Sequence, residues 1–189
     1  GRVCDSPDAV VEAFDTLGPS AVKAQVAAGK RGKSGGIRLV DTRDAARDAA
    51  TRLLGAEIGG RVVERLLVEQ RVDVVTELYA AVLNDPGTKG PLLLVSPAGG
   101  TEVEEIAATQ PESLTRLAID IRHGPGRNAL SQAAAKVVGS SRQDALVYFL
   151  SALYDVYRTN DADLVEVNPL AVTRDGQLMA LDCKLSLDD

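Results

Sequence analysis

Apolar residues recur at helical or strand-like spacing over residues 1–70. Ser6-Pro7 is typical of a helix start, because proline suits the first helical turn, and Gly18-Pro19 is typical of its end. Thr42 is expected to cap a second helix, which Gly55 ends. The expected elements are helices at 7–17 and 42–54 and strands at 21–26, 36–40 and 63–69. This pattern predicts a small α/β lobe.

The remaining residues predict a larger lobe, with a boundary near residues 69–73. Apolar runs at 76–84 and 91–96 flank Asp85-Pro86-Gly87 and predict a hairpin. Helices are expected at 102–108, 130–138 and 143–159, the last with an apolar stripe of Ala145, Phe149, Ala152, Leu153 and Val156. We therefore expect an α/β (α+β) fold with two domains, 1–70 and 71–189.

The segment from Glu166 to Asp182 predicts a C-terminal hairpin. Two apolar runs flank the turn signal Asp175-Gly176, and a three-residue loop with a left-handed Gly176 sets the strand register. In that register Asn168 lies opposite Asp182, and their side-chain oxygens point the same way.

A carboxylate and an amide carbonyl are hard oxygen ligands of the kind that Mg²⁺ prefers. Asn168 and Asp182 are too few to close an octahedron, so water and substrate phosphates would complete it. Enzymes that use nucleotides hold Mg²⁺ in this way. The alternative interpretation is an edge hairpin whose polar residues face solvent.

A glycine-rich loop at 25–36 carries three cations and four glycines between two expected strands. Such a loop can surround phosphate oxygens with backbone N–H groups and cationic side chains. It is not a P-loop, because the first glycine of that motif falls on Ala27 and a strand rather than a helix follows. The alternative is a solvated hairpin without a ligand.

The composition argues against several classes of protein. A net charge of −6 and an aromatic content of 3% disfavour a nucleic-acid surface. Cys4 and Cys183 stand apart from each other and from any zinc-type spacing, which favours a reduced, cytoplasmic protein. We expect no membrane partner, because no apolar run reaches the roughly 18 residues of a membrane helix and the first residues are not a signal peptide.

Motifs along almost the whole chain share their order and spacing with one family. They are Val22-Lys23-Ala24-Gln25, Arg31-Gly32-Lys33, Leu67-Val68-Glu69, Glu77-Leu78-Tyr79, Gly99-Gly100 before Glu102-Val103-Glu104, and the segment from Glu166 to Asp182. In these motifs the chain resembles the ATP-grasp domain of the succinyl-CoA synthetase (ADP-forming succinate–CoA ligase) β-subunit family, whose close relatives are malate–CoA ligase and ATP-citrate lyase. The resemblance implies an ATP-grasp fold, in which two α/β lobes hold the nucleotide between them.

The resemblance also implies roles for individual residues. Lys23 would reach the nucleotide phosphates, and Lys30, Arg31 and Gly32 would form a lid. Glu69 and Val72 would line the base pocket, and Glu77 would bind the ribose hydroxyls. Asn168 and Asp182 would ligate Mg²⁺, and Glu166 would face an incoming histidine. A lysine on a strand provides a fixed cation, and a carboxylate can accept two hydrogen bonds from a diol, which agrees with these roles. Alternatively, Glu166 only orients Asn168.

The chain departs from the family at the lid and at the transfer site. Lys30 stands where relatives have glycine, and Ala98 stands where they have glutamate. The family's first helix and its C-terminal CoA-ligase domain lie outside the sequence, so we expect a part of a larger enzyme.

In the family, Mg²⁺ and ATP (or GTP) phosphorylate a histidine on a CoA-binding α-type subunit or domain, and that phosphate activates a carboxylic acid for capture by CoA. Catalysis of this kind is mainly positioning and charge neutralisation. The sole histidine of the chain, His123, is expected to be a surface residue, so the phosphorylated histidine must come from a partner. The open alternatives are a non-catalytic nucleotide-binding or assembly module of the same fold, and a ligase for citrate or malate.

Overall fold

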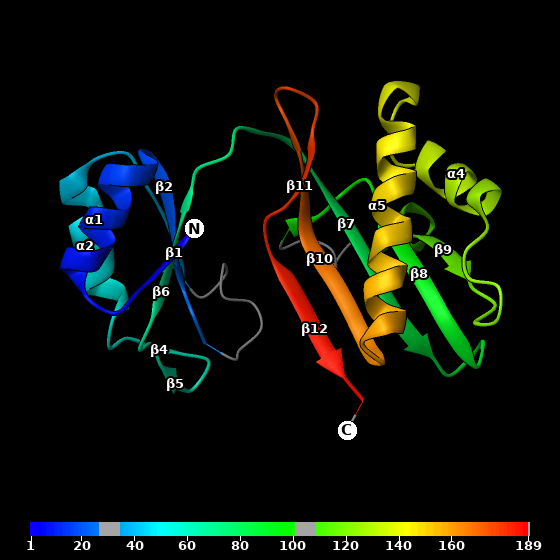
Figure 1. The fold of residues 1–189 in the computed structure, drawn as a ribbon, viewed down its shortest axis with the longest axis horizontal. Helices are drawn as coiled ribbons and strands as arrows, with labels where there is room; N and C mark the ends of the chain where they lie inside the picture. The colour runs from blue at the N-terminus through cyan, green and yellow to red at the C-terminus, as the bar shows by residue number, and fades with distance from the viewer. Residues whose placement is uncertain (27–34, 101–108, 189) are drawn as a thin grey trace. The chain divides into compact units, whose positions relative to one another are not determined.

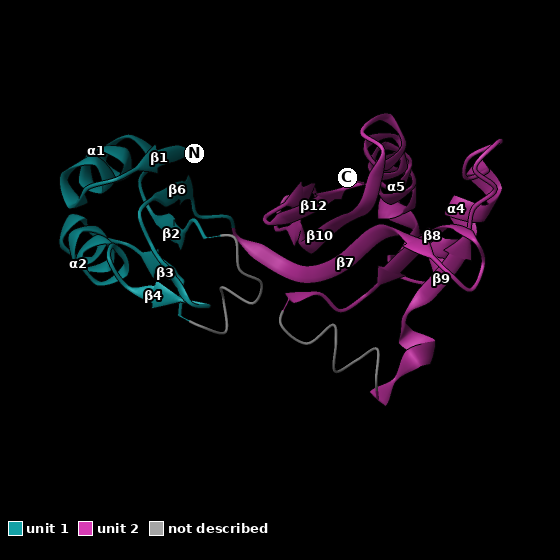
Figure 2. Cartoon of the chain, turned by 90° about the horizontal axis from the view of Figure 1, so that it is seen from below, with its two compact units in different colours: residues 1–72 teal, residues 73–189 magenta. Residues whose placement is uncertain are grey.

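The computed structural model describes residues 1–26, 35–100 and 109–188. The chain divides into two compact units, Gly1–Val72 and Asp73–Asp189, which Figure 2 colours separately. The expected lid residues Lys30, Arg31 and Gly32 and the helix expected at 102–108 lie outside the described residues. Within the described ranges, no helix is long and apolar enough to cross a membrane.

Unit 1 is an antiparallel sheet with two helices packed on one face (Figure 1). Its elements are β1 (Arg2–Cys4), α1 (Pro7–Leu17), β2 (Ser20–Ala24), β3 (Ile37–Val40), α2 (Arg43–Leu53), β4 (Glu57–Ile58), β5 (Arg61–Val62) and β6 (Leu66–Gln70). The main sheet has the order β1-β6-β2-β3, and β4 pairs with β5. Val22 and Val68 from the sheet meet Val10 and Ala46 from the helices in the core of this unit.

Side-chain caps fix where the two helices of unit 1 begin. Ser6 Oγ accepts a hydrogen bond from the Ala9 N–H at 3.3 Å, and Thr42 Oγ1 accepts one from the Ala45 N–H at 3.1 Å. Gly18 ends α1 with a φ of 72°, a left-handed conformation that glycine adopts without strain. Both helices predicted in this unit are therefore confirmed to within a residue.

The strand predicted at 63–69 begins only at Leu66. Val63 instead makes two backbone hydrogen bonds of 2.9 Å, accepting from the Gly55 N–H and donating to the Ala56 carbonyl. The short β4–β5 hairpin, which the apolar pattern did not predict, therefore separates α2 from β6.

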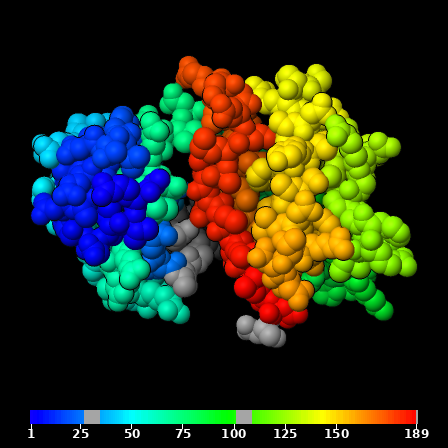
Figure 3. Space-filling view, viewed as in Figure 1, coloured from blue at the N-terminus to red at the C-terminus, as the bar shows by residue number. Residues whose placement is uncertain are grey.

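Unit 2 is an antiparallel sheet covered on one face by two helices (Figures 1 and 2). Its elements are β7 (Val74–Asp85), β8 (Gly90–Ser96), a short 3₁₀ helix (Pro111–Ser113), β9 (Thr115–Ala118), α4 (Arg127–Ala135), α5 (Ser140–Thr159), β10 (Ala162–Thr173), β11 (Leu178–Ala180) and β12 (Cys183–Leu187). The strand order is β11-β10-β7-β8-β9, and β12 also pairs with β10. The exposed β12 runs along the surface in Figure 3. The predicted β7–β8 hairpin is confirmed.

The stripe predicted for α5 is wrong in most positions. Only Leu153 of that stripe is buried, Phe149 is half-buried, and Ala145, Ala152 and Val156 are exposed. The buried side of α5 consists of Leu146, Val147, Leu150, Leu153, Tyr154 and Tyr157. Two apolar stripes of helical spacing coexist on this helix, and the one with larger side chains buries more apolar area.

Candidate functional site

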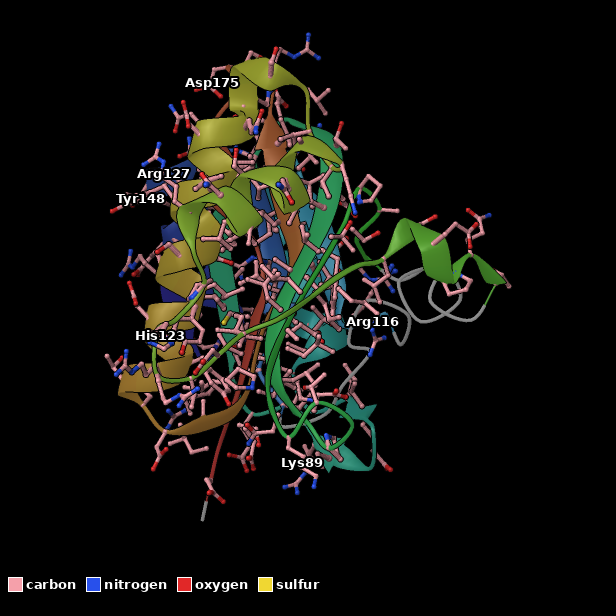
Figure 4. All side chains as sticks on the ribbon, turned by 90° about the vertical axis from the view of Figure 1, so that its right-hand side faces the viewer. Lys89, Arg116, His123, Arg127, Tyr148 and Asp175 are labelled. Carbon is pink, nitrogen blue, oxygen red and sulfur yellow. The ribbon has the colours of Figure 1, made fainter. Side chains whose placement is uncertain are left out.

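The register of the C-terminal hairpin is the one that the sequence predicts. Leu170 pairs with Ala180, Val167 pairs with Cys183, and the Asn168 N–H donates to the Asp182 carbonyl at 3.1 Å. Gly176 has a φ of 85°, and its N–H donates to the Thr173 carbonyl at 2.9 Å. Asn168 of β10 thus lies beside Asp182, which lies between β11 and β12. Asp175 lies at the turn that sets this register (Figure 4).

The side chain of Asn168 binds both polar groups of one residue, Gly100. Its Oδ1 accepts from the Gly100 N–H at 2.6 Å, and its Nδ2 donates to the Gly100 carbonyl at 3.0 Å. The pairing of β10 with β7 shifts by one residue between Val167 and Leu170, at this point of the strand. The amide of Asn168 is therefore fixed by the loop that follows β8.

One face of the unit 2 sheet gathers the polar residues singled out by the sequence. On β10, Val165 and Val167 point into the core beneath the helices, so Glu166 and Asn168 point to the opposite face. On β7, Leu78 and Ala80 point into the same core, so Glu77 and Tyr79 share the face of Glu166. Four polar side chains from two paired strands therefore line one surface.

Glu166 accepts a hydrogen bond from a buried tyrosine on this face. The Tyr79 hydroxyl donates to Glu166 Oε2 at 3.3 Å. Burial, and then the charge and hydrogen bond of Glu166, raise the pKa of the Tyr79 phenol, so it stays a donor. Burial, and then the negative charges of Asp182 and Glu166, also raise the pKa of the Cys183 thiol. Both carboxylates therefore act on the same region of the sheet.

The donor atoms on this face fit Mg²⁺. Asp182 is half-buried, and its Oδ1 accepts from the Cys183 N–H at 3.0 Å. The Asn168 carbonyl oxygen has a second lone pair beyond the one that Gly100 uses. Among the described residues no three His, Cys, Asp or Glu side chains cluster as a metal cage. A few hard oxygen donors are the usual protein contribution to Mg²⁺ bound with phosphates and water.

In unit 1, Lys23 and Glu69 form an ion pair. Lys23 Nζ lies 2.7 Å from Glu69 Oε2, and their side chains are 13% and 38% exposed. Val22 and Val68 point into the core under α1 and α2, so Lys23 and Glu69 lie on the other face of the sheet. Val72, the last residue of this unit, is half-buried.

His123 lies in an exposed loop on the helix side of unit 2 (Figure 4). Its side chain is 76% exposed and lies 3.1 Å from Asp120, whose pKa is held below its usual range by Arg122 and then by His123 itself. Gly124 packs against Tyr154 of α5, whereas Glu166 and Asn168 point to the sheet face opposite the helices. His123 is therefore a surface residue, as its sequence context predicts.

Two residues of this site were missed by reasoning from the sequence. Tyr79 could have been found, because it lies two residues after Glu77 on a strand and so shares its face. The contact of Gly100 with Asn168 joins residues 68 positions apart and leaves no periodic signal.

Ala98 is half-buried, and its N–H donates to Ser96 Oγ at 3.2 Å in the same loop.

Comparison with known proteins identifies the family of the chain. Residues 1–172 match the model of the ATP-grasp domain. The chain is 39% identical to the β subunit of ADP-forming succinate–CoA ligase from Halorubrum lacusprofundi, over 100% of this chain and 50% of that protein. The chain thus spans about half the length of the curated relatives it matches.

Two solved structures share the fold. One is ATP citrate lyase from Methanothrix soehngenii in complex with citrate and coenzyme A, with 22% identity, a TM-score of 0.73, and coverage of 99% of this chain and 44% of that one. The other is dinucleotide-forming acetyl-coenzyme A synthetase 1 from Ca. Korarchaeum cryptofilum with coenzyme A and Mg-AMPPCP, with 14% identity, a TM-score of 0.68, and coverage of 99% and 84%. Its phosphohistidine segment points towards the nucleotide-binding site. The predicted α/β ATP-grasp fold is confirmed, and the chain belongs to the ATP-grasp domain family.

Proposed function

We propose that the chain binds a Mg²⁺-nucleotide as the ATP-grasp part of an ADP-forming acid–CoA ligase resembling the succinate–CoA ligase β subunit. The observation that carries the proposal is the register of β10 with the C-terminal hairpin. It sets the amide of Asn168 beside Asp182 on the face that also holds Glu77 and Glu166. An edge hairpin with merely solvated polar residues would not need Asn168 to be bound at both ends of its amide.

Each proposed nucleotide contact uses a residue whose chemistry suits it. In unit 2, Asn168 and Asp182 would hold Mg²⁺, and the exposed Glu77 would accept hydrogen bonds from the ribose hydroxyls. In unit 1, Lys23 would bind the phosphates. Glu69 and Val72 would line the base pocket, and Lys30, Arg31 and Gly32, which lie outside the described residues, would contribute lid contacts.

The proposed reaction transfers a phosphoryl group from ATP to a histidine of a CoA-binding α-type subunit or domain. Magnesium, when bound, would supply charge neutralisation at the phosphate oxygens. Lys23 would add a fixed positive charge, and Glu166, held by the Tyr79 hydroxyl, would face the histidine and accept a proton from its ring. The name of the Halorubrum relative favours succinate as the acid, with citrate or malate as the alternative.

The test of this proposal is labelling of a partner. Radiolabelled ATP and GTP are supplied with Mg²⁺ to the chain in a full-length ligase that contains the CoA-binding partner. We expect label on a partner histidine with the parent and its loss with Glu166→Gln, while nucleotide binding measured by calorimetry persists. The preferred nucleotide follows from the same titrations. Undiminished labelling in the variant would contradict the role of Glu166.

A non-catalytic module of the same fold is the second candidate, and it is favoured by Ala98. This residue lies two positions before Gly100, whose backbone binds the Asn168 side chain, and the family that the chain resembles has a glutamate there. A module of this kind would bind Mg-nucleotide but leave every partner histidine unlabelled. If the missing carboxylate at position 98 is the sole cause of the inactivity, Ala98→Glu should restore labelling of the partner histidine.

A further inference from the structure

Gly100 and Asn168 form a two-bond clamp that joins the loop after β8 to β10. The Gly100 N–H donates to Asn168 Oδ1 at 2.6 Å, and the Gly100 carbonyl accepts from Asn168 Nδ2 at 3.0 Å. We propose that Gly100 is a positioning residue for the Mg²⁺ ligand Asn168, and that this clamp requires an amide rather than a carboxylate at position 168. This inference rests on the proposed function of Asn168 as a metal ligand.

The two bonds fix the orientation of the Asn168 amide. A backbone N–H can only meet the carbonyl oxygen of the side chain, and a backbone carbonyl can only meet its NH₂ group. Exchanging the two ends of the amide would break both bonds and oppose like groups at Gly100. The carbonyl oxygen therefore stays on one side, with one lone pair used by Gly100 and the other available to a cation.

The backbone conformation at the clamp favours glycine. Gly100 has a φ of +78°, which other residues rarely adopt, and a Cβ there would lie 2.5 Å from Glu77 Oε2, so that the Glu77 side chain would have to move. The preceding Gly99 donates its N–H to the Glu77 carbonyl at 2.8 Å, and a Cβ on Gly99 would lie 2.2 Å from the Leu78 carbonyl oxygen. The loop is thus seated closely on β7 before it reaches Asn168.

The clamp explains why a neutral ligand stands beside Asp182. A second carboxylate would normally strengthen the attraction for Mg²⁺. In Asn168→Asp, however, an acceptor oxygen would replace Nδ2, which now lies 3.0 Å from the Gly100 carbonyl oxygen. Two acceptors would then face each other without a proton, and the side chain would turn away from Gly100. The negative charge gained in Asn168→Asp would therefore be offset, because Gly100 would no longer hold the ligand oxygen in place.

The test combines amide exchange without metal and metal binding without catalysis. Hydrogen exchange of the Gly100 amide is followed by NMR in the metal-free chain, and Mn²⁺ binding in the presence of ADP is followed by electron paramagnetic resonance. The variants are Asn168→Asp and Gly100→Ala. Gly55→Ala is the control, because Gly55 has the same φ of +78° but nothing within 4 Å of its added Cβ.

We expect the Gly100 amide to exchange slowly in the parent and at least about tenfold faster in Asn168→Asp, because its acceptor is displaced. Mn²⁺ affinity should fall about tenfold in Asn168→Asp and in Gly100→Ala, and stay unchanged in Gly55→Ala. Equal or tighter Mn²⁺ binding by Asn168→Asp, or unchanged exchange at Gly100, would overturn the inference while leaving the proposed function intact. A parent chain that binds no Mn²⁺ would overturn both.

Discussion

Lys23 Nζ lies 2.7 Å from Glu69 Oε2, on the face of the unit 1 sheet opposite α1 and α2. The lysine side chain is only 13% exposed, so few positions are open to its ammonium group. Glu69 therefore has a structural role besides the proposed one in base binding: it holds the cation that would meet the phosphates.

Glu69→Gln separates these two roles. If the carboxylate mainly orients Lys23, the variant should weaken ADP binding by about tenfold and leave adenosine binding nearly unchanged, because adenosine has no phosphate. Calorimetry with both ligands measures the difference. Asp41→Asn is the matched control, since it removes a carboxylate from the 2.8 Å pair with Arg71 in the same unit. An equal loss for adenosine and ADP would assign Glu69 to the base alone.

Glu77→Gln tests the proposed ribose contact. The variant should weaken ATP binding by about 1–3 kcal/mol, or roughly one to two decades of affinity, because an anionic acceptor is lost. Pyrophosphate should bind as it does to the parent, since it has no ribose. Glu112→Gln, at another exposed carboxylate of unit 2, serves as the control. Parallel losses for ATP and pyrophosphate would place Glu77 away from the sugar.

Gly99→Ala should destabilise unit 2. The new Cβ would lie 2.2 Å from the Leu78 carbonyl oxygen, a backbone atom that cannot rotate away, so the loop or β7 must shift. We expect the free energy of unfolding to fall by about 1–3 kcal/mol in urea titrations. Gly139→Ala is the control, because nothing lies within 4 Å of its added Cβ. Equal stability of the two variants would mean that the loop is not seated on β7.

Tyr79 should make the stability of the chain depend on alkaline pH. The folded state raises the pKa of this phenol, chiefly by burial, so above about pH 10 the unfolded chain releases a proton that the folded chain keeps. The free energy of unfolding should therefore fall as pH rises through this range.

Tyr79→Phe should remove this part of the alkaline fall, which reaches at most about 1.4 kcal/mol per pH unit. Urea titrations at about pH 8 and about pH 11 measure it. Tyr148→Phe, at a side chain that is 78% exposed, should keep the full dependence. Part of the alkaline fall in the free energy of unfolding should persist in Tyr79→Phe, because the pKa of Tyr157 is also raised. An identical fall in the parent and in Tyr79→Phe would contradict the account.

Local signals predicted what short-range chemistry determines. Ser6 and Thr42 cap helices with their own oxygens, and Gly176 sets the hairpin register by its backbone conformation. Counting back from that turn predicts that Asn168 lies opposite Asp182, and the Asn168 N–H donates to the Asp182 carbonyl in the structure. Such features depend only on residues that are close in sequence or paired by one turn.

Features that depend on tertiary packing could not be predicted from the sequence. Ala152 and Val156 have the same helical spacing as Leu146 and Leu150, and only packing against β7 and β10 decides which side of α5 is buried. The Gly100 clamp joins distant segments and was not predictable from periodicity. Val63 was predicted to begin a strand, but its backbone N–H and carbonyl bond to Ala56 and Gly55 instead.

The most direct test of the central claim is calorimetric titration of ATP, with and without Mg²⁺, into the parent, Asp182→Ala and Asn168→Ala. We expect Mg²⁺-dependent binding in the parent and none in Asp182→Ala, with unchanged circular dichroism, because a single carboxylate carries most of the protein's attraction for the ion. Asn168→Ala should be milder, since water can replace a neutral carbonyl. Asp188→Ala, an exposed carboxylate just after β12, should bind as the parent does. Parent-like Mg-ATP binding by both Asp182→Ala and Asn168→Ala would mean that the hairpin holds no metal.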